Sequence, residues 1–311
     1  VRALAPWLAL VPGTPQPEPV TYDELRALAE EFLADLRRAD DAFAGVQDTR
    51  VRLPLRLGLG RLDLDGDGVP ERPLTEWLQA LLPEASRGLD PELLVSFDRG
   101  DAAWFRGYCK LFMGLLELGL AYDHRELFET AGYLLFPRAV PAGPRPAGNL
   151  QFGRFLDAAA LLHLVRFPLE DGARLAAALE HFEAAIASDL ECWDHALAQE
   201  GDDHEWLPNP RQKGVFGVAV SGEMIDAWRG LLSTAREVLA GRLLIPYWRG
   251  GGGVNVRRFF LRPRPFDLVL WIQGLGALPY VEQGPTVSRE VARRLTGVFG
   301  SRTLAFGLWF N

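Results

Sequence analysis

Residues 100–122 read GDAAWFRGYCKLFMGLLELGLAY, and this stretch sets the architecture expected of the chain. If it is helical, apolar side chains such as Leu111, Phe112, Leu115 and Leu118 nearly surround the helix. A helix that is apolar on all sides is usually buried. We therefore expect a mainly α protein with this helix at the centre of its core.

Apolar residues recur at helical spacing on both sides of that stretch. Thr21 and Glu24 have the pattern of a capping box, in which each side chain accepts a hydrogen bond from the backbone of the other residue, so we expect a helix over 22–46. Further helices are predicted over 74–82, 124–136, 151–166, 170–199, 222–240, 266–274 and 288–298. We expect helical hairpins packed around one core.

Only a few short β-strands are expected beside these helices. Between Val51 and Leu59, leucines alternate with arginine, proline and glycine, which is the period of a strand, and Pro54 restricts that strand to a sheet edge. Two more short strands are predicted at 254–261 and 303–310. The predicted fold class is mainly α, with a few short strands beside the helical hairpins.

The chain divides into four parts by composition. Residues 1–20 form an extended arm, with four prolines between residues 12 and 19. A helical region over 21–137 follows, then a linker rich in proline and glycine over 138–149, and a second helical region over 150–311. Because 311 residues fit one large domain or two modest ones, we expect the second region to pack on the first as one continuous globule.

Composition excludes several classes of partner. The formal net charge is −8, from 33 basic and 41 acidic residues, which gives no electrostatic case for nucleic acid. No apolar run reaches the roughly 18 residues of a membrane span. A protein partner stays open, and no small-molecule ligand is indicated. Cys109 and Cys192 are either buried thiols or a disulfide. Only Lys110 and Lys213 are lysines, and we assign this arginine bias no role.

The most specific motif is Asp63-Leu-Asp-Gly-Asp-Gly-Val-Pro-Glu71. Its aspartates stand at alternate positions, and like charges packed so closely repel one another unless a cation neutralises them. Carboxylate and carbonyl oxygens are the ligands that calcium prefers. The expected Ca²⁺ ligands are Asp63, Asp65, Asp67, the Val69 carbonyl, Glu71 and Glu76. The alternative is an acidic surface turn without an ion.

The same stretch resembles the calcium loop of EF-hand proteins. Asp63, Asp65, Asp67, the Val69 carbonyl and Glu71 match the first five ligand positions of that family. The last position departs from it, because Leu74 stands where the family has a bidentate glutamate, and Glu76 lies two residues later. The segment before the loop reads as a strand and not as a helix. We therefore expect a single strand–loop–helix site in which calcium is structural.

A second acidic pair, Asp98 and Asp101, precedes the central helix. Two nearby carboxyl groups can serve as a general acid and base, with Asp123 or Glu205 as further candidates. The simpler interpretation is that Asp98 caps the helix and Asp101 complements the helix dipole in its first turn. The spacing favours the cap.

Histidine and cysteine positions raise a possible zinc site. Cys192 and His195 share a helix face, and His181 and His204 lie nearby in sequence. A zinc motif such as Cys-x-x-Cys is missing, so separate structural roles are favoured. His163 is predicted to be a core or helix-packing residue.

Two loop regions are candidates for contact with other molecules. Trp206 and Trp248 lie near loops and are the tryptophans most suited to an exposed surface. Gly250–Gly253 lies between Arg249 and a second arginine pair and could cradle an anion, but it lacks the ending of a phosphate loop. A hairpin loop is the expected structure there.

Four segments together resemble a family of uncharacterised exported bacterial proteins. They are Asp63–Gly68, Phe97–Asp101, Glu205–Arg211 and Arg264–Asp267. The resemblance implies a periplasmic or secreted location and no known activity. The chain starts at Val1, which removal of an export signal and a cloning boundary explain equally well.

We therefore expect an exported, calcium-binding helical protein that acts as a scaffold or binding component and not as an enzyme. The alternatives are a hydrolase that uses Asp98 and Asp101, or a subunit of a larger assembly. A deep cleft where the carboxylates converge would favour the hydrolase. A filled core beside an exposed apolar patch would favour the binding component.

Overall fold

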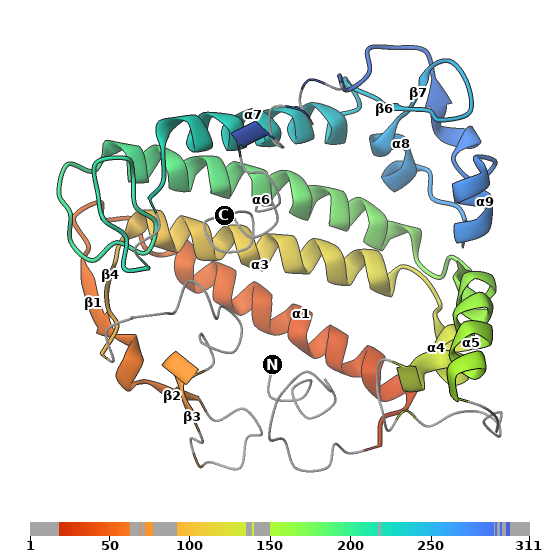
Figure 1. Ribbon diagram of the computed structural model, residues 1–311, viewed down its shortest axis with the longest axis horizontal. Helices are drawn as coiled ribbons and strands as arrows, with labels where there is room; N and C mark the ends of the chain where they lie inside the picture. The colour runs from red at the N-terminus through yellow and green to blue at the C-terminus, as the bar shows by residue number, and fades with distance from the viewer. Residues whose placement is uncertain are drawn as a thin grey trace. The chain divides into compact units, whose positions relative to one another are not determined.

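The computed structural model describes residues 19–62, 69, 72–76, 92–134, 139, 150–216, 219–288, 290, 293, 297 and 298. The protein is mainly α, as predicted, with a few short strands (Figure 1). The helices are α1 (Tyr22–Ala44), α3 (Arg99–Leu120), α4 (Arg125–Ala131), α5 (Leu150–Leu164), α6 (Gly172–Ala198), α7 (Gly222–Leu239), α8 (Val256–Leu261) and α9 (Leu268–Gln273), with short 3-10 turns η1 (Leu57–Leu59), η2 (Gly132–Leu134) and η3 (Leu278–Tyr280).

The strands pair antiparallel in small sheets. They are β1 (Leu53–Arg56), β2 (Arg61–Leu62), β3 (Arg72–Pro73), β4 (Leu94–Phe97), β5 (Arg166–Phe167), β6 (Ile245–Pro246), β7 (Gly253–Val254), β8 (Phe266–Asp267) and β9 (Val281–Glu282). β1 pairs with β4, β2 with β3, β5 with β8, and β7 lies between β6 and β9. In the β1–β4 pair Pro54 lies opposite Ser96, which confirms the predicted strand with proline at an edge.

Two compact units make up the chain, and each is assembled from separate segments. Unit 1 consists of residues 1–35, 113–180 and 238–286, and unit 2 of residues 36–112, 181–237 and 287–311. The division into an arm, two helical regions and a linker stays a prediction.

Capping residues set several helix starts. At α1, the Thr21 N–H donates to the Glu24 carboxylate at 2.8 Å and the Glu24 N–H donates to Thr21 Oγ1 at 3.3 Å, which confirms the predicted capping box. The strand predicted at 254–261 is wrong beyond its first residue. Asn255 Oδ1 accepts the N–H of Arg258 at 3.0 Å, so the chain turns into α8 directly after β7.

The core of unit 2 forms where the first half of α3 meets the second half of α6. Trp193 and Val95 are fully buried there, and Ile225 of α7 closes the cluster. Trp104 contacts Trp206 with ring centroids 5.8 Å apart. These aromatic and aliphatic side chains give the unit a filled interior.

The prediction that α3 is buried on all sides is wrong for one face. Met113 and Leu120 are buried, but Leu111, Phe112 and Leu115 are between 38% and 48% exposed. Leu115 lies four positions after Leu111 and three after Phe112, so the exposed residues form one stripe. Packing covers the opposite side of α3 and leaves this stripe uncovered.

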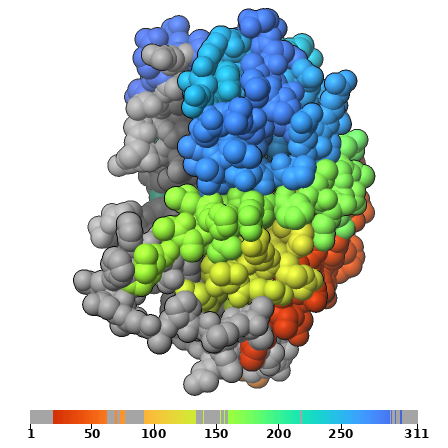
Figure 2. All heavy atoms as spheres, turned by 90° about the vertical axis from the view of Figure 1, so that its right-hand side faces the viewer, coloured from red at the N-terminus to blue at the C-terminus, as the bar shows by residue number. Residues whose placement is uncertain are grey.

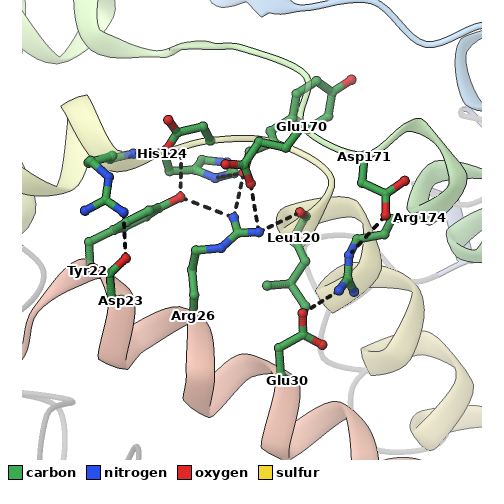
Figure 3. A network of polar contacts seen from close by, with 12 residues as sticks. Tyr22, Asp23, Arg26, Glu30, Leu120, His124, Glu170, Asp171 and Arg174 are labelled. Atoms are coloured by element: carbon green, nitrogen blue, oxygen red, sulfur yellow. Dashed lines mark hydrogen bonds and ion pairs between the residues drawn. The ribbon is translucent and has the colours of Figure 1, made fainter.

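In unit 1, arginine side chains of α1 and α6 join helix ends to one another (Figure 3). Arg26 donates to the carbonyls of Leu120 at 3.2 Å and Tyr122 at 3.0 Å and pairs with Glu170 at 2.8 Å. The carbonyls at the end of a helix have no partner within the helix, so the guanidinium satisfies the end of α3. The backbone N–H of His124 donates to the Tyr22 hydroxyl at 2.8 Å.

Arg174 holds the other end of this network. Its guanidinium bonds to Glu117 at 2.8 Å, contacts Glu30, and lies 3.9 Å from Asp171. The Glu117 side chain is only 4% exposed. A carboxylate buried to that extent needs a cation beside it, because taking an uncompensated charge out of water is costly.

Replacing Arg174 with alanine is expected to lower the free energy of unfolding by about 3–5 kcal/mol, since Glu117 then loses its buried cation. Arg166→Ala is the matched control, because its pair with Glu126 is about half exposed on both sides and should contribute little to stability. Urea unfolding measures both effects. Adding Glu117→Gln to the Arg174→Ala variant should restore part of the lost stability. Equal effects of the two alanine substitutions would show that buried Glu117 does not depend on the charge of Arg174.

Candidate functional site

The predicted calcium ligands Asp63, Asp65, Asp67 and Glu71 lie outside the described residues. The chain that brackets them is described, and it forms a small hairpin in which Arg61 pairs with Pro73 and Leu62 with Arg72. Val69 and Glu76 are both exposed. Among the residues that the structure describes, no three His, Cys, Asp or Glu side chains gather as a metal site. Calcium binding stays a prediction.

Asp98 and Asp101 form a buried capping box at the start of α3. Asp98 Oδ1 accepts the N–H of Gly100 at 2.6 Å and that of Asp101 at 3.2 Å, while the Asp98 N–H donates to Asp101 Oδ2 at 2.8 Å. This is the structural role favoured from sequence. Both side chains are less than 8% exposed, however, which a cap does not require.

Segments of unit 2 that are distant in sequence complete the surroundings of these carboxylates. Asp98 Oδ2 lies 3.3 Å from an Arg52 nitrogen and also accepts a hydrogen bond from the Gln199 amide. Glu205, only 5% exposed, lines the same small cavity as Asp98 and Asp101. Glu205 was a candidate from the sequence, but no local pattern connects Arg52 or Gln199 to Asp98.

Burial controls the protonation of this group. Burial raises the pKa of Asp101 to about 8. The hydrogen bond from the Asp98 backbone lowers this pKa, whereas the negative charges of Asp98 and Glu205 raise it. Burial also raises the pKa of Glu205 to about 7, and the charge of Asp98 adds to this rise. One cluster therefore contains a carboxyl group that keeps its proton at neutral pH.

The space between these groups is too small for a substrate. The cavity bounded by Asp98, Asp101 and Glu205 has a volume of about 10 Å³. A cavity of roughly that size holds about one water molecule. A substrate therefore has no room to reach the carboxyl groups.

The two cysteines are free and buried, so the disulfide alternative is wrong. Burial raises the pKa of the Cys192 thiol well above its usual value, and the charge of Asp189 acts in the same direction. Asp189 accepts the Trp228 indole N–H at 3.1 Å, and burial raises its pKa to about 7. A thiol held protonated in this way is not a nucleophile.

The histidines do not assemble into a metal site. Nε2 of His195 lies 3.8 Å from Glu191, and Nδ1 of His204 lies 3.4 Å from its neighbour Asp203. Separate structural roles for the histidines and Cys192 stay a prediction. His163 is exposed on α5, so the core alternative predicted for it is wrong, whereas a helix-packing role stays a prediction. Asp123 accepts the Arg125 N–H at 2.8 Å, as a residue at a helix junction should.

The two tryptophans predicted to lie at an exposed surface differ in exposure. Trp206 is only 9% exposed and packs in the core of unit 2, so that prediction is wrong. Trp248 is 52% exposed, as predicted, at the turn between β6 and β7 of unit 1. The Trp248 indole N–H donates to the Ile272 carbonyl at 3.0 Å, which places this turn directly beside α9.

Around Trp248 and α9 lies a concentration of exposed apolar side chains, which we call the α9 surface. It consists of Trp248, Val269, Leu270, Ile272, Leu275 and Leu278, each between 44% and 64% exposed. α9 has no fully buried residue. Figure 2 shows this side of unit 1, where residues 240–286 in blue border the green of α5. α9 packs against α5, and the Leu268 N–H donates to the Val165 carbonyl at 2.9 Å.

The α9 surface is held in place and is not a frayed end. Asp267 caps the helix by accepting the Leu270 N–H at 2.9 Å, and Gly274 ends it with a φ of +106°, a conformation that glycine adopts without strain. Trp271 points the other way and packs against Phe259 and Tyr280. The stretch LVLWIQGLGAL is apolar almost throughout, a pattern that by itself predicts burial, so only the packing around α9 reveals its exposed side chains.

The chain matches no protein-family model, no curated protein and no solved structure at a significant level. Within the described part of the chain, no helix is long and apolar enough to cross a membrane. Evidence for a function therefore comes from the geometry of the carboxylate cluster and of the α9 surface.

The raised pKa values make stability depend on pH. A carboxyl group that keeps its proton in the folded state, while the unfolded chain loses it near pH 4, stabilises the fold at low pH, and this contribution is lost as pH rises to about 8. Between pH 5 and pH 8 the Asp101→Asn variant should lose less stability than the parent protein, by at least about 1 kcal/mol.

Chemical unfolding at several pH values measures this difference, with Glu205→Gln expected to give a smaller effect in the same direction. Asp226→Asn, at an exposed position of α7, is the control and should follow the parent curve. Parallel curves for Asp101→Asn and the parent protein would show that Asp101 is ionised in the fold.

Proposed function

We propose that this protein is a non-enzymatic binding component that docks through the α9 surface of unit 1. The observation that supports this most is the concentration of rigidly held, exposed apolar side chains around α9. Most soluble proteins expose apolar residues singly, and larger exposed patches mark contact sites. Capping by Asp267 and packing of Trp271 keep the helix formed while its apolar residues stay in solvent.

The carboxylate cluster supports the hydrolase alternative less well. Asp98, Asp101 and Glu205 do converge, and burial raises the pKa values of Asp101 and Glu205 to about 8 and about 7. The cavity between them admits about one water molecule, and the hydrogen bonds of Asp98 and Asp101 are those of a helix cap. The convergence therefore fits a proton-holding structural element of unit 2.

Calcium has a structural role in this proposal, at the loop between β2 and β3. Pairing of these strands supports it, because the hairpin holds the two ends of the loop together and so lowers the cost of ordering the carboxylates. Residence in the periplasm or outside the cell fits a structural calcium ion, since even a weak site is filled at millimolar calcium. The proposed ligands are those expected from the sequence: Asp63, Asp65, Asp67, the Val69 carbonyl, Glu71 and Glu76.

Chelation is expected to lower the melting temperature by at least about 4 °C, because a ligand that binds only the folded state stabilises it. Asp65→Ala should lower the melting temperature by a similar amount and make it insensitive to chelator. Asp48→Ala, at an exposed aspartate paired with Arg50, is the control and should respond to chelator as the parent protein does. Differential scanning calorimetry with and without chelator measures all three, and an unchanged melt would contradict a structural ion.

Docking is tested by photo-crosslinking in cells that produce the protein. A benzophenone amino acid at Ile272 should give a discrete adduct, whether to protein or to lipid, because that side chain is 64% exposed at the centre of the α9 surface. The control places the same group at Leu59 of unit 2, which is 62% exposed and lies outside that surface. The same yield and pattern at both positions would contradict docking through α9.

A further inference from the structure

The stretch that carries the α9 surface is basic in an otherwise acidic protein. Residues 240–286 contain six arginines and only two carboxylates, Asp267 and Glu282, whereas the whole chain has a formal net charge of −8. Arg258 pairs with Glu282 at 3.0 Å, and Arg249, Arg262 and Arg264 are exposed. Among the described residues, no carboxylate forms an ion pair with these three arginines.

Arg249 brings positive charge to the edge of the α9 surface. The aliphatic part of its side chain packs over Gly274, at the end of α9, where a side chain on residue 274 would clash with it. Arg249 follows Trp248, whose indole binds the carbonyl of Ile272. The neighbouring Tyr247 donates its hydroxyl to the Gly274 carbonyl at 3.2 Å. An arginine thus stands beside a tryptophan and a group of aliphatic side chains.

A cationic pocket lies on the helix that packs against α9. Its volume is about 350 Å³, and Arg257, Arg258 and Arg262 contribute to its lining. α8 carries these arginines and contacts α9 through Phe259 and Trp271, whose ring centroids are 5.7 Å apart. Arg257 donates to the Leu239 carbonyl at 3.4 Å and Arg258 pairs with Glu282, so Arg262 is the exposed guanidinium here that can form charge-assisted hydrogen bonds with phosphate oxygens.

We propose that the α9 surface docks this protein on an anionic lipid bilayer, with Trp248 and the aliphatic side chains entering the interface and the arginines contacting lipid phosphates. This inference rests on the proposed function and names the partner of that site. Apolar and aromatic side chains beside arginine are the composition of interfacial membrane anchors. Lipid is favoured over a protein because a standard protein interface uses about 20–30 residues a side, many more than the α9 surface provides.

Co-sedimentation with vesicles tests the lipid partner on the intact protein. Vesicles of equal parts phosphatidylcholine and phosphatidylglycerol should bind it at least about tenfold more tightly than vesicles of phosphatidylcholine alone. Raising the ionic strength from about 0.01 M to about 0.15 M should weaken binding to the anionic vesicles, because the Debye length falls from roughly 30 Å to 8 Å. Absence of binding, or equal binding to both kinds of vesicle, would overturn the proposal.

Two variants separate the apolar and the electrostatic contributions. Ile272→Ser combined with Leu275→Ser should weaken binding to anionic vesicles at least about tenfold. Replacing Arg249, Arg262 and Arg264 with glutamine should reduce binding to the level seen with phosphatidylcholine. Leu59→Ser and Arg50→Gln in unit 2 are the matched controls and should bind as the parent protein does. Variants that bind as tightly as the parent would also overturn the proposal.

Depth of insertion gives a readout that does not depend on these variants folding. Brominated phosphatidylcholine in the anionic vesicles should quench tryptophan fluorescence of the parent protein, and Trp248→Phe should lose most of that quenching. The crosslinking result at Ile272 then separates the two proposals. A protein adduct there without vesicle binding would leave the binding function in place and exclude the lipid partner, whereas loss of both would remove the binding function itself.

Discussion

Arginine side chains at the carboxyl ends of the long helices are the interaction on which the rest of the structure depends. Arg26 binds carbonyls at the end of α3, Arg211 binds the carbonyls of Leu197 and Gln199 at the end of α6, and Arg257 binds that of Leu239 at the end of α7. Each guanidinium comes from outside the helix whose end it binds. The last carbonyls of a helix lack partners within it, and a positive charge there also complements the helix dipole.

These contacts give the bias for arginine over lysine a structural meaning that composition did not reveal. A planar guanidinium with five donors can bind two carbonyls and a carboxylate at once, as Arg26 does with Leu120, Tyr122 and Glu170. Lysine offers a single charged group and cannot span that geometry. Buried carboxylates such as Glu117 are kept in the fold by the same means.

Two sites show opposite outcomes of burial. In unit 2, packing encloses Asp98, Asp101 and Glu205 so tightly that the pKa values of Asp101 and Glu205 rise and little space is left for a ligand. In unit 1, packing covers Trp271 but leaves leucine and isoleucine side chains of α9, and Trp248 beside it, in solvent near exposed arginines. The enclosed carboxyl groups are of the kind that a catalytic site uses, but the cavity beside them is too small for a substrate. The α9 surface, in contrast, has accessible side chains suited to docking.

Local sequence was enough for the features that depend on neighbouring residues. The capping box at Thr21, the cap at Asp98, the edge strand at Pro54 and the mainly helical class follow from short-range spacing and hydrogen bonding. Asn255 shows the limit of this reasoning. It caps α8 directly after β7, so residues that the sequence pattern assigned to a strand form a helix.

Tertiary structure alone decided which faces are covered and which distant groups meet. The stripe at Leu111 and Leu115 is as apolar as a core face, yet it is exposed because no element packs on it. Trp206 and Trp248 both lie near loops in the sequence, but only Trp206 is buried by the elements around it. Arg52 and Gln199 reach Asp98 only because three separate segments fold together. Burial and long-range pairing are properties of the whole packing arrangement, and no local pattern of residues encodes them.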